Sequence, residues 1–268
     1  MLDIAKYAEG HLLVEVKEQI AVATLNRPER LNAVADGLHE ALETFFHDVN
    51  ADPEVNVIVL TGAGRGFCGG GDMKMMAARP DDAPWEPMQL FRGPKWVIQR
   101  MLNCEQPIIA AINGPAAGFG ATLALCCDVT FMADTARIGD SHVVGGLTAG
   151  DGGAIVWPLL VGPSRAKDML MTGRLLTGEE AGAMGVVNYV MPAETLMDEA
   201  MAYARKLADG PTLAIRLSKM AVNRHLWQSL QNTFDFSLAA EAISSRSLDH
   251  REASRAFAEK RTPKYQGR

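Results

Sequence analysis

The chain has 268 residues, 48% hydrophobic and 22% charged, which is the ordinary composition of a globular protein. Its formal net charge of −6 disfavours nucleic acid as a partner. Because there is neither a run of about 18 apolar residues nor a basic leader with an apolar core, we expect a cytoplasmic protein without a membrane span.

The first part of the chain predicts strands and helices in alternation. Residues 13–16 and 20–25 alternate apolar and polar side chains, which indicates a β-hairpin. Residues 36–49 place apolar side chains at helical spacing, with the first residue as the N-cap, and residues 55–61 predict a buried strand. The alternation continues to about Gly162, which suggests repeated β-β-α units and therefore an α/β fold.

Two glycine-rich segments each follow an apolar strand. Residues 62–74 (GAGRGFCGGGDMK) come after the strand 57–60, and residues 113–122 (NGPAAGFGAT) come after the strand 108–112. The second segment enters a small-residue helix, whose first N–H groups lack partners within the helix. Two such loops can direct N–H groups at one oxygen atom and form an oxyanion hole. Alternatively, the small residues only permit close helix packing.

Residues 79–94 differ from their surroundings, since they are rich in proline and acidic residues. We expect an irregular, partly mobile segment beside the first glycine-rich loop, where it could form a substrate wall. The apolar side chains of Trp85, Met88, Phe91 and Trp96 would then line an acyl pocket. The alternative is a surface loop held by a few apolar anchors.

The remainder of the chain predicts mainly helices, at residues 164–171, 177–184, 193–208 and 212–224 and in a long segment over 227–260. We therefore divide the chain into a core of residues 1–190 and a helical region of residues 191–268. The four cysteines include the adjacent pair Cys126 and Cys127 in an apolar run. Such cysteines indicate core thiols, and neither a disulfide framework nor a metal site is expected.

Taken in order, the motifs resemble those of the crotonase (enoyl-CoA hydratase/isomerase) superfamily. They are TLNRPERLNA at 24–33, FCGGGD at 67–72, the segment 113–128, LLTGEEA at 175–181, GVVN at 185–188 and FAEKR at 257–261. The resemblance covers nearly the whole chain. It implies a spiral of ββα repeats with a C-terminal helical trimerisation region, a homotrimer or dimer of trimers, and an acyl-CoA substrate with no further cofactor.

The resemblance also implies an oxyanion hole made by the backbone N–H groups of Gly71 and Phe119. Enoyl-CoA hydratases of this superfamily carry two glutamates, and Thr122 and His142 stand at the matching positions here. A threonine hydroxyl can orient water but cannot act as a general acid or base near neutral pH. The two-carboxylate hydration mechanism is therefore not expected in its usual form.

His142 and Asp151 are the remaining candidates for acid–base chemistry. A carboxylate fixes the tautomer of a neighbouring imidazole and stabilises its charged form, which suits the activation of water. The alternatives are that Asp151 caps the following helix and that His142 is a structural pocket residue. Asp140 is a weaker candidate, since it precedes His142 by two residues and is typical of a turn or cap.

His142 and Asp151, followed by Trp157-Pro158, also resemble the 6-oxocamphor hydrolase branch of the superfamily, the β-diketone hydrolases. Members of that branch cleave a C–C bond and need no CoA. The resemblance is incomplete, because Phe119 stands where that branch has another histidine. We therefore rank an acyl-CoA substrate above a diketone.

Basic residues should meet the phosphates of CoA, and the candidates are Arg30, Lys74, Lys260 and Lys264. The alternative for each is a solvated surface position. Gly69, Asp72 and Thr122 are expected beside the substrate, with Asp72 fixing the first glycine-rich loop through its own backbone contacts.

Three functions follow from the sequence. The first is an acyl-CoA enzyme of hydratase/isomerase type, in which His142 and Asp151 replace the usual glutamates. The second is a hydrolase that cleaves a C–C or thioester bond with water activated by His142 and Asp151. The third is a non-catalytic acyl-CoA binder. The fold alone does not choose among them.

Overall fold

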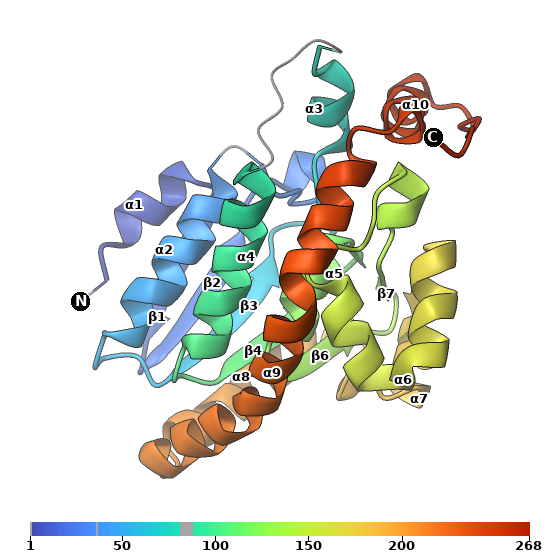
Figure 1. The fold of residues 1–268 in the computed structure, drawn as a ribbon. Helices are drawn as coiled ribbons and strands as arrows, with labels where there is room; N and C mark the ends of the chain where they lie inside the picture. Colours follow the sequence, from blue (N-terminus) through green and yellow to red (C-terminus); the bar gives the residue numbers. More distant parts are fainter. Residues whose placement is uncertain (1, 36, 81–87) are drawn as a thin grey trace.

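A six-stranded sheet organises the computed structural model, which describes residues 2–35, 37–80 and 88–268 (Figure 1). Its strand order is β1-β2-β3-β4-β6-β9, with only the β1–β2 pair antiparallel. The strands are β1 (Leu12–Lys17), β2 (Ile20–Leu25), β3 (Val57–Gly62), β4 (Ile108–Ile112), β6 (Val129–Ala133) and β9 (Tyr189–Met191). The predicted hairpin and the predicted α/β class are both confirmed.

A second sheet, of three strands, begins in the segment after β4. It contains β5 (Ala116–Ala117), β7 (Arg137–Gly139) and β8 (Leu176–Thr177) in the order β5-β7-β8. Its first strand also pairs with the loop after β3, through a parallel bridge between Cys68 and Ala116. The small sheet therefore joins the two glycine-rich loops.

Four helices precede the second sheet. They are α1 (Ile4–Glu9), α2 (Leu38–Asn50), α3 (Met73–Ala78) and α4 (Met88–Asn103). The apolar face of α2 predicted from its spacing is buried, and α2 packs against α4. The proposed N-cap residue Asp36 lies outside the described residues.

The prediction of an irregular segment over residues 79–94 is wrong for its last part, because α4 begins at Met88 and contains Pro94. Proline removes one backbone donor from a helix. Here the buried apolar side chains of Val97, Ile98 and Met101 hold the helix in place despite that loss. Residues 81–87 lie outside the described part of the chain.

The helices in the second half of the chain are α5 (Phe119–Leu125), α6 (Gly153–Thr172), α7 (Gly178–Ala183), α8 (Leu196–Ala208), α9 (Thr212–Ser244) and α10 (Leu248–Glu259). Two 3-10 helices, η1 (Pro28–Arg30) and η2 (His142–Gly145), complete the set. The segments predicted at 212–224 and 227–260 placed a break near residue 225. Instead, α9 is continuous there, and the break between helices lies at residues 245–247.

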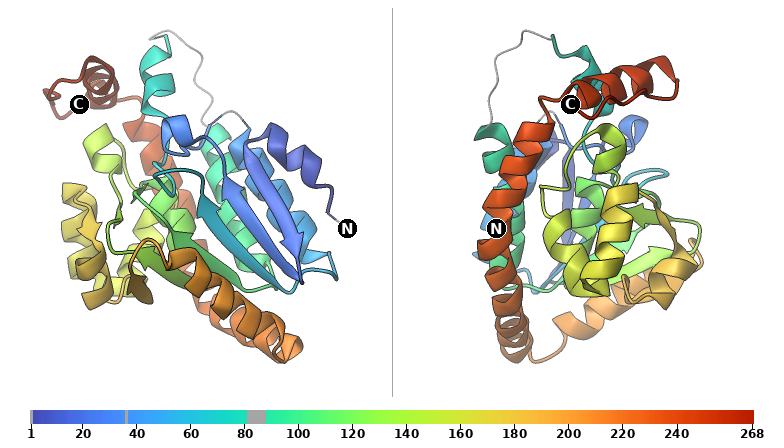
Figure 2. Two further views of the ribbon diagram at one scale, coloured as in Figure 1. Left: turned by 180° about the vertical axis from the view of Figure 1, so that it is seen from behind. Right: turned by 45° about the vertical axis from the view of Figure 1, so that its right-hand side comes forward.

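The helical region is packed on the sheet and does not stand apart from it. Helix α8 lies across β2, β3, β4 and β6 (Figure 2). The long helix α9 passes beside α4 and α6 (Figure 1). No helix among the described residues combines the length and apolar character that crossing a membrane requires.

Asn32 fixes the path of the chain after β3. Its side chain is fully buried, and its Nδ2 donates to the carbonyl oxygens of Ala63 (3.0 Å), Gly66 (2.8 Å) and Phe67 (3.2 Å). Its Oδ1 accepts from the N–H of Arg27 at 2.9 Å. One side chain thus joins the loop after β2 to the first glycine-rich loop.

We expect Asn32→Asp to lower the free energy of unfolding by about 3 kcal/mol or more, because the variant loses the amide donor and places an oxygen against buried carbonyls. Urea unfolding followed by circular dichroism measures the loss. Asn232→Asp, an exposed change on α9, is the matched control and should change stability by less than about 0.5 kcal/mol. Equal effects of the two changes would contradict this role of Asn32.

Candidate active site

The two glycine-rich loops are in direct backbone contact. Ala117 N donates to Cys68 O at 2.9 Å, and a Cβ atom added at Gly120 would lie only 2.1 Å from that same oxygen. The Cys68 thiol is itself buried and lies 3.2 Å from Asn32 O. Only glycine permits this approach, which brings the first residue of α5, Phe119, beside the first loop.

The N–H groups of Gly71 and Phe119 are available as donors. Val34 N donates to Gly70 O at 2.7 Å, so this bridge uses the carbonyl before Gly71 and not the Gly71 N–H. Phe119 opens α5, where an N–H group has no partner within the helix. Within the described residues, neither N–H donates to another protein group. Both N–H groups could therefore donate to a ligand oxygen, as an oxyanion hole requires.

His142 lies between two carboxylates. Its Nδ1 is 2.7 Å from Asp140 Oδ1, and its Nε2 is 3.1 Å from Asp151 Oδ2. The three residues come from the end of β7, the start of η2 and the loop before α6. Only 9% of the His142 side chain is exposed, and both carboxylates are buried. The predicted pair is thus part of a triad of Asp140, His142 and Asp151.

The carboxylates decide the charge of the imidazole. Burial alone would lower the pKa of His142, but the negative charges of Asp151 and Asp140 together raise it well above the usual value. Burial likewise opposes ionisation of Asp140, yet the contact with His142 lowers the pKa of that carboxyl. The two carboxylates therefore favour the protonated ring, which is hydrogen-bonded to Asp140 through Nδ1 and ion-paired with Asp151 through Nε2.

Asp140 has a larger role than its place in the sequence suggested. Its Oδ1 accepts from the backbone N–H of His142 at 3.1 Å as well as from the ring. The turn predicted at this position is present, and it folds the ring back onto the same carboxylate. A spacing of two residues thus gives both an Asx turn and an ion pair.

Asp151 does not cap the helix that follows it. The N-cap of α6 is Gly152, and no side chain caps that helix. Gly152 has φ +130°, and a Cβ atom there would lie 2.4 Å from the Cγ2 atom of Thr122. Thr122 Oγ1 in turn is 3.5 Å from Asp151 Oδ1. The carboxylate is therefore directed at His142 and Thr122.

Glu241, which the sequence analysis did not select, adds a third carboxyl. It lies on α9 with 4% of its surface exposed, and its Oε2 has no hydrogen-bond partner within the described residues. A Cβ atom at Gly150 would lie 2.6 Å from that oxygen. Burial, and then the negative charge of Asp151, raise the pKa of Glu241 to about 8. Glu241 is therefore largely protonated at neutral pH.

His39 is a second group that the sequence analysis missed. Its ring lies 5.3 Å from the ring of Phe119. Burial lowers the pKa of His39, and the charges of Glu40 and Asp151 only partly oppose that effect. A neutral imidazole therefore stands on the α2 side of the candidate oxyanion hole.

A local signal existed for Glu241 but not for His39. Glu241 follows the buried residues Phe234 and Leu238 at helical spacing, so it occupies the apolar face of α9. An acidic residue on such a face is unusual and marks a buried carboxyl. His39 has ordinary neighbours in α2, and only the tertiary structure brings it to the site.

The first glycine-rich loop uses two of the predicted substrate-binding groups for its own structure. Gly69 N donates to Leu31 O at 2.8 Å. Asp72 caps α3 by accepting from the backbone N–H groups of Lys74 (3.1 Å) and Met75 (3.2 Å), and it pairs with Arg27 at 3.3 Å. These contacts hold the loop that presents the Gly71 N–H.

The predicted basic residues have different surroundings. Lys74, Lys260 and Lys264 are exposed. Arg30 is half-buried, and its Nη1 is buried with no hydrogen-bond partner among the described residues. Helices α3 and α10 pack together, and Lys74 lies on α3 whereas Lys260 directly follows α10.

The predicted acyl pocket is described only in part. Trp85 lies outside the described residues, and so does the side chain of Met88. Phe91 is partly buried against the core. Trp96 is 44% exposed and does not line a closed pocket.

Two glycine-rich loops with free N–H groups, set beside buried acid and base groups in a parallel-rich α/β fold, define an enzyme of the crotonase class. The chain belongs to the enoyl-CoA hydratase/isomerase family, whose family model matches residues 15–268.

Individual relatives agree with this assignment. The chain is 36% identical over 258 residues to a 1,2-epoxyphenylacetyl-CoA isomerase of Escherichia coli, covering 96% of this chain and 98% of the relative. It is 32% identical over 255 residues to a crotonyl-CoA hydratase of Syntrophomonas wolfei, covering 95% and 97%.

Solved structures give the same result. An enoyl-CoA hydratase/isomerase from Mycobacterium paratuberculosis superposes with a TM-score of 0.84 at 33% identity, over 91% of this chain and 97% of that one. An enoyl-CoA hydratase from Mycobacterium avium subsp. paratuberculosis superposes with a TM-score of 0.86 at 26% identity, over 96% and 98%.

The raised pKa of Glu241 makes stability depend on pH. Its pKa in the folded state, about 8, lies above the ordinary 4.5. The contribution of Glu241 to the free energy of unfolding is therefore fully present below pH 4.5 and is lost as the pH rises through about 8. Glu241→Gln stays neutral throughout. Between those two pH values we expect the wild type to lose roughly 4 kcal/mol relative to this variant.

Urea unfolding at several pH values measures this difference. Glu199→Gln, an exposed change on α8, is the matched control and should follow the wild type at every pH. Parallel pH profiles for the wild type and Glu241→Gln would show that Glu241 ionises normally.

Proposed function

We propose that the protein is an acyl-CoA isomerase, which moves a carbon–carbon double bond by transferring a proton. The observation that carries the proposal is the position of the Asp151 carboxylate. It is paired with His142 and lies beside the Thr122 hydroxyl. An isomerase needs one base, whereas a hydratase of the usual type needs two carboxylates around a water molecule. The similarity to a relative named 1,2-epoxyphenylacetyl-CoA isomerase supports isomerisation of a CoA thioester in general, although that relative's named substrate is an epoxide.

The reaction divides among the groups as follows. The thioester oxygen accepts from the N–H groups of Gly71 and Phe119, which stabilise the negative charge of an enolate. Asp151 takes a proton from the carbon next to the carbonyl or from the carbon beyond the double bond. The electrons of that C–H bond form the enolate, which takes a proton back at the other carbon. His142 and Asp140 hold Asp151 in place. Glu241 is uncharged when protonated, so it adds no further negative charge to the site.

The hydrolase alternative is less well supported by the geometry. A histidine that activates water needs one ring nitrogen with a free lone pair. Both ring nitrogens of His142 face carboxylates, since Nδ1 lies 2.7 Å from Asp140 Oδ1 and Nε2 lies 3.1 Å from Asp151 Oδ2. Water activation by His142 would first require its separation from Asp151 and the loss of its proton.

We also propose that Lys74 and Lys260 meet the phosphates of CoA, since both are exposed and lie on or directly after the packed helices α3 and α10. Arg30 belongs to the same proposal, because its buried Nη1 has no protein partner within the described residues. A homotrimer or a dimer of trimers, and a cytoplasmic location, remain proposals drawn from the family resemblance.

One experiment separates the candidate functions. The purified protein is incubated in D2O with a 3-enoyl-CoA, a 2-enoyl-CoA and a cyclic 1,3-diketone, and the products are followed by mass spectrometry and chromatography. An isomerase converts the 3-enoyl-CoA to the 2-enoyl-CoA and incorporates deuterium without gaining water. Gain of water by the 2-enoyl-CoA would identify a hydratase, and gain of water by the diketone would identify a C–C hydrolase.

We expect Asp151→Asn to reduce isomerisation by about 10²–10⁴-fold, because the amide cannot accept the proton. Steady-state kinetics with the 3-enoyl-CoA measures the loss. Asp168→Asn, an exposed change on α6, is the matched control and should leave the rate unchanged. Retention of activity in Asp151→Asn would remove Asp151 from the role of base.

A further inference from the structure

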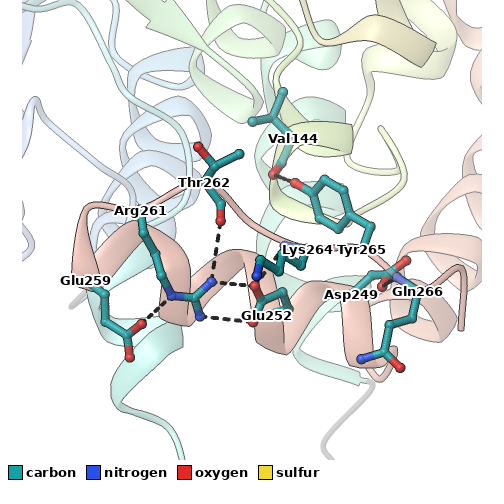
Figure 3. A network of polar contacts seen from close by, with 9 residues as sticks. All are labelled: Val144, Asp249, Glu252, Glu259, Arg261, Thr262, Lys264, Tyr265 and Gln266. Carbon is teal, nitrogen blue, oxygen red and sulfur yellow. Dashed lines mark hydrogen bonds and ion pairs between the residues drawn. The ribbon is translucent and has the colours of Figure 1, made fainter.

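The 3-10 helix that carries His142 is held by residues far along the sequence. His250 Nδ1 lies 2.7 Å from Gly145 O, and because a carbonyl only accepts, this nitrogen carries the proton. The hydroxyl of Tyr265 donates to Val144 O at 2.6 Å (Figure 3). Both acceptors belong to η2, and the donors lie 105 and 121 residues further along the chain.

These two donors belong to one folded unit, residues 247–268, which we call the clasp. Within it, Asp249 Oδ1 accepts from the N–H of Gln266 at 2.6 Å. Arg261 Nη2 donates to Glu252 Oε2 at 3.0 Å. Figure 3 shows that these contacts fold the segment after α10 back onto the helix. Tyr265 is thereby fixed in position and is not part of a free tail.

The clasp is also in backbone contact with η2. Gly146, directly after η2, has φ +67°, and a Cβ atom there would lie 2.7 Å from His250 N. The outer surface of η2 gives little burial, since Val143 is 36% and Val144 is 53% exposed. The residue before η2, Ser141, makes no capping hydrogen bond with its side chain. The helix η2 is therefore held from two sides, by α6 and by the clasp.

We propose that the clasp is a positioning element for the catalytic site, in which His250 and Tyr265 hold η2 so that the His142 ring stays between Asp140 and Asp151. His250 and Tyr265 are positioning residues that act through the backbone of η2. The effect on turnover rests on the proposed function, whereas the effect on the His142 ring does not.

The titratable groups that face His142 come from three parts of the chain. They are Asp140 after β7, Asp151 before α6 and Glu241 on α9. His250 packs against η2 from α10, and burial lowers its own pKa, so it is neutral near pH 7. A change at His250 therefore adds or removes no charge beside His142 under those conditions.

The proton affinity of His142 reports its position. The hydrogen bonds from His250 and Tyr265 hold the backbone of η2 in place. Without them the ring moves away from the carboxylates, and the electrostatic cause of its raised pKa weakens. In His250→Ala/Tyr265→Phe we expect the pKa of His142 to fall by about one unit, which is a tenfold loss of proton affinity.

NMR titration of 15N-labelled histidine side chains measures this pKa on the substrate-free protein, with His142→Asn identifying the resonance. His250→Asn supplies an amide donor to Gly145 O and should keep the pKa near that of the wild type. His225→Ala/Tyr189→Phe removes an exposed histidine and an exposed tyrosine hydroxyl elsewhere and is the matched control. Circular dichroism tests whether each variant is folded. If His250→Ala/Tyr265→Phe does not fold, the two single variants are titrated in its place.

An unchanged His142 pKa in the folded clasp variants would overturn the proposal, and so would an equal fall in the matched control. With the 3-enoyl-CoA, the clasp variants should lose about three- to tenfold in kcat with little change in KM, because the substrate contacts remain. If no turnover is found with any substrate, the proposed function fails while the NMR result still decides the role of the clasp.

Discussion

The site depends on one buried charge arrangement, the imidazolium of His142 between the carboxylates of Asp140 and Asp151. Burying charges is costly unless each is paired and hydrogen-bonded. Removing one member of such a group leaves an uncompensated buried charge, at a cost of about 3–5 kcal/mol. The arrangement therefore also fastens the end of β7, the start of η2 and the loop before α6 to one another.

The rest of the site keeps the total charge low. With His142 positive, Asp140 and Asp151 leave one net negative charge, and Glu241 stays neutral because burial raises its pKa to about 8. His39 also stays neutral, since burial lowers its pKa. The proposed oxyanion donors are backbone N–H groups without formal charge. An anionic reaction intermediate thus meets dipoles and not a second full negative charge.

The sequence predicted what local patterns determine. The β1–β2 hairpin, the apolar face of α2 and the two glycine-rich loops all follow from spacing within short segments. Pairing of His142 with Asp151 was also predicted, whereas the contact of Asp140 with the His142 ring was not, because a spacing of two residues indicated only a turn. Glu241 and His39 reach the site through the packing of α9 and α2, and no pattern around His39 signals this. The irregular segment predicted over residues 79–94 overlaps the start of α4, because tertiary packing of α4 outweighs the local cost of Pro94.

The close approach of the two glycine-rich loops also determines the chemistry of a thiol. Cys68 pairs with Ala116 in the wall of the candidate oxyanion hole, and burial raises the pKa of its thiol to about 12. A thiolate in that wall could exchange with a bound thioester and become acylated, but a protonated thiol is a poor nucleophile. The packing around Cys68 therefore also keeps its thiol unreactive toward the thioester that we propose as the substrate.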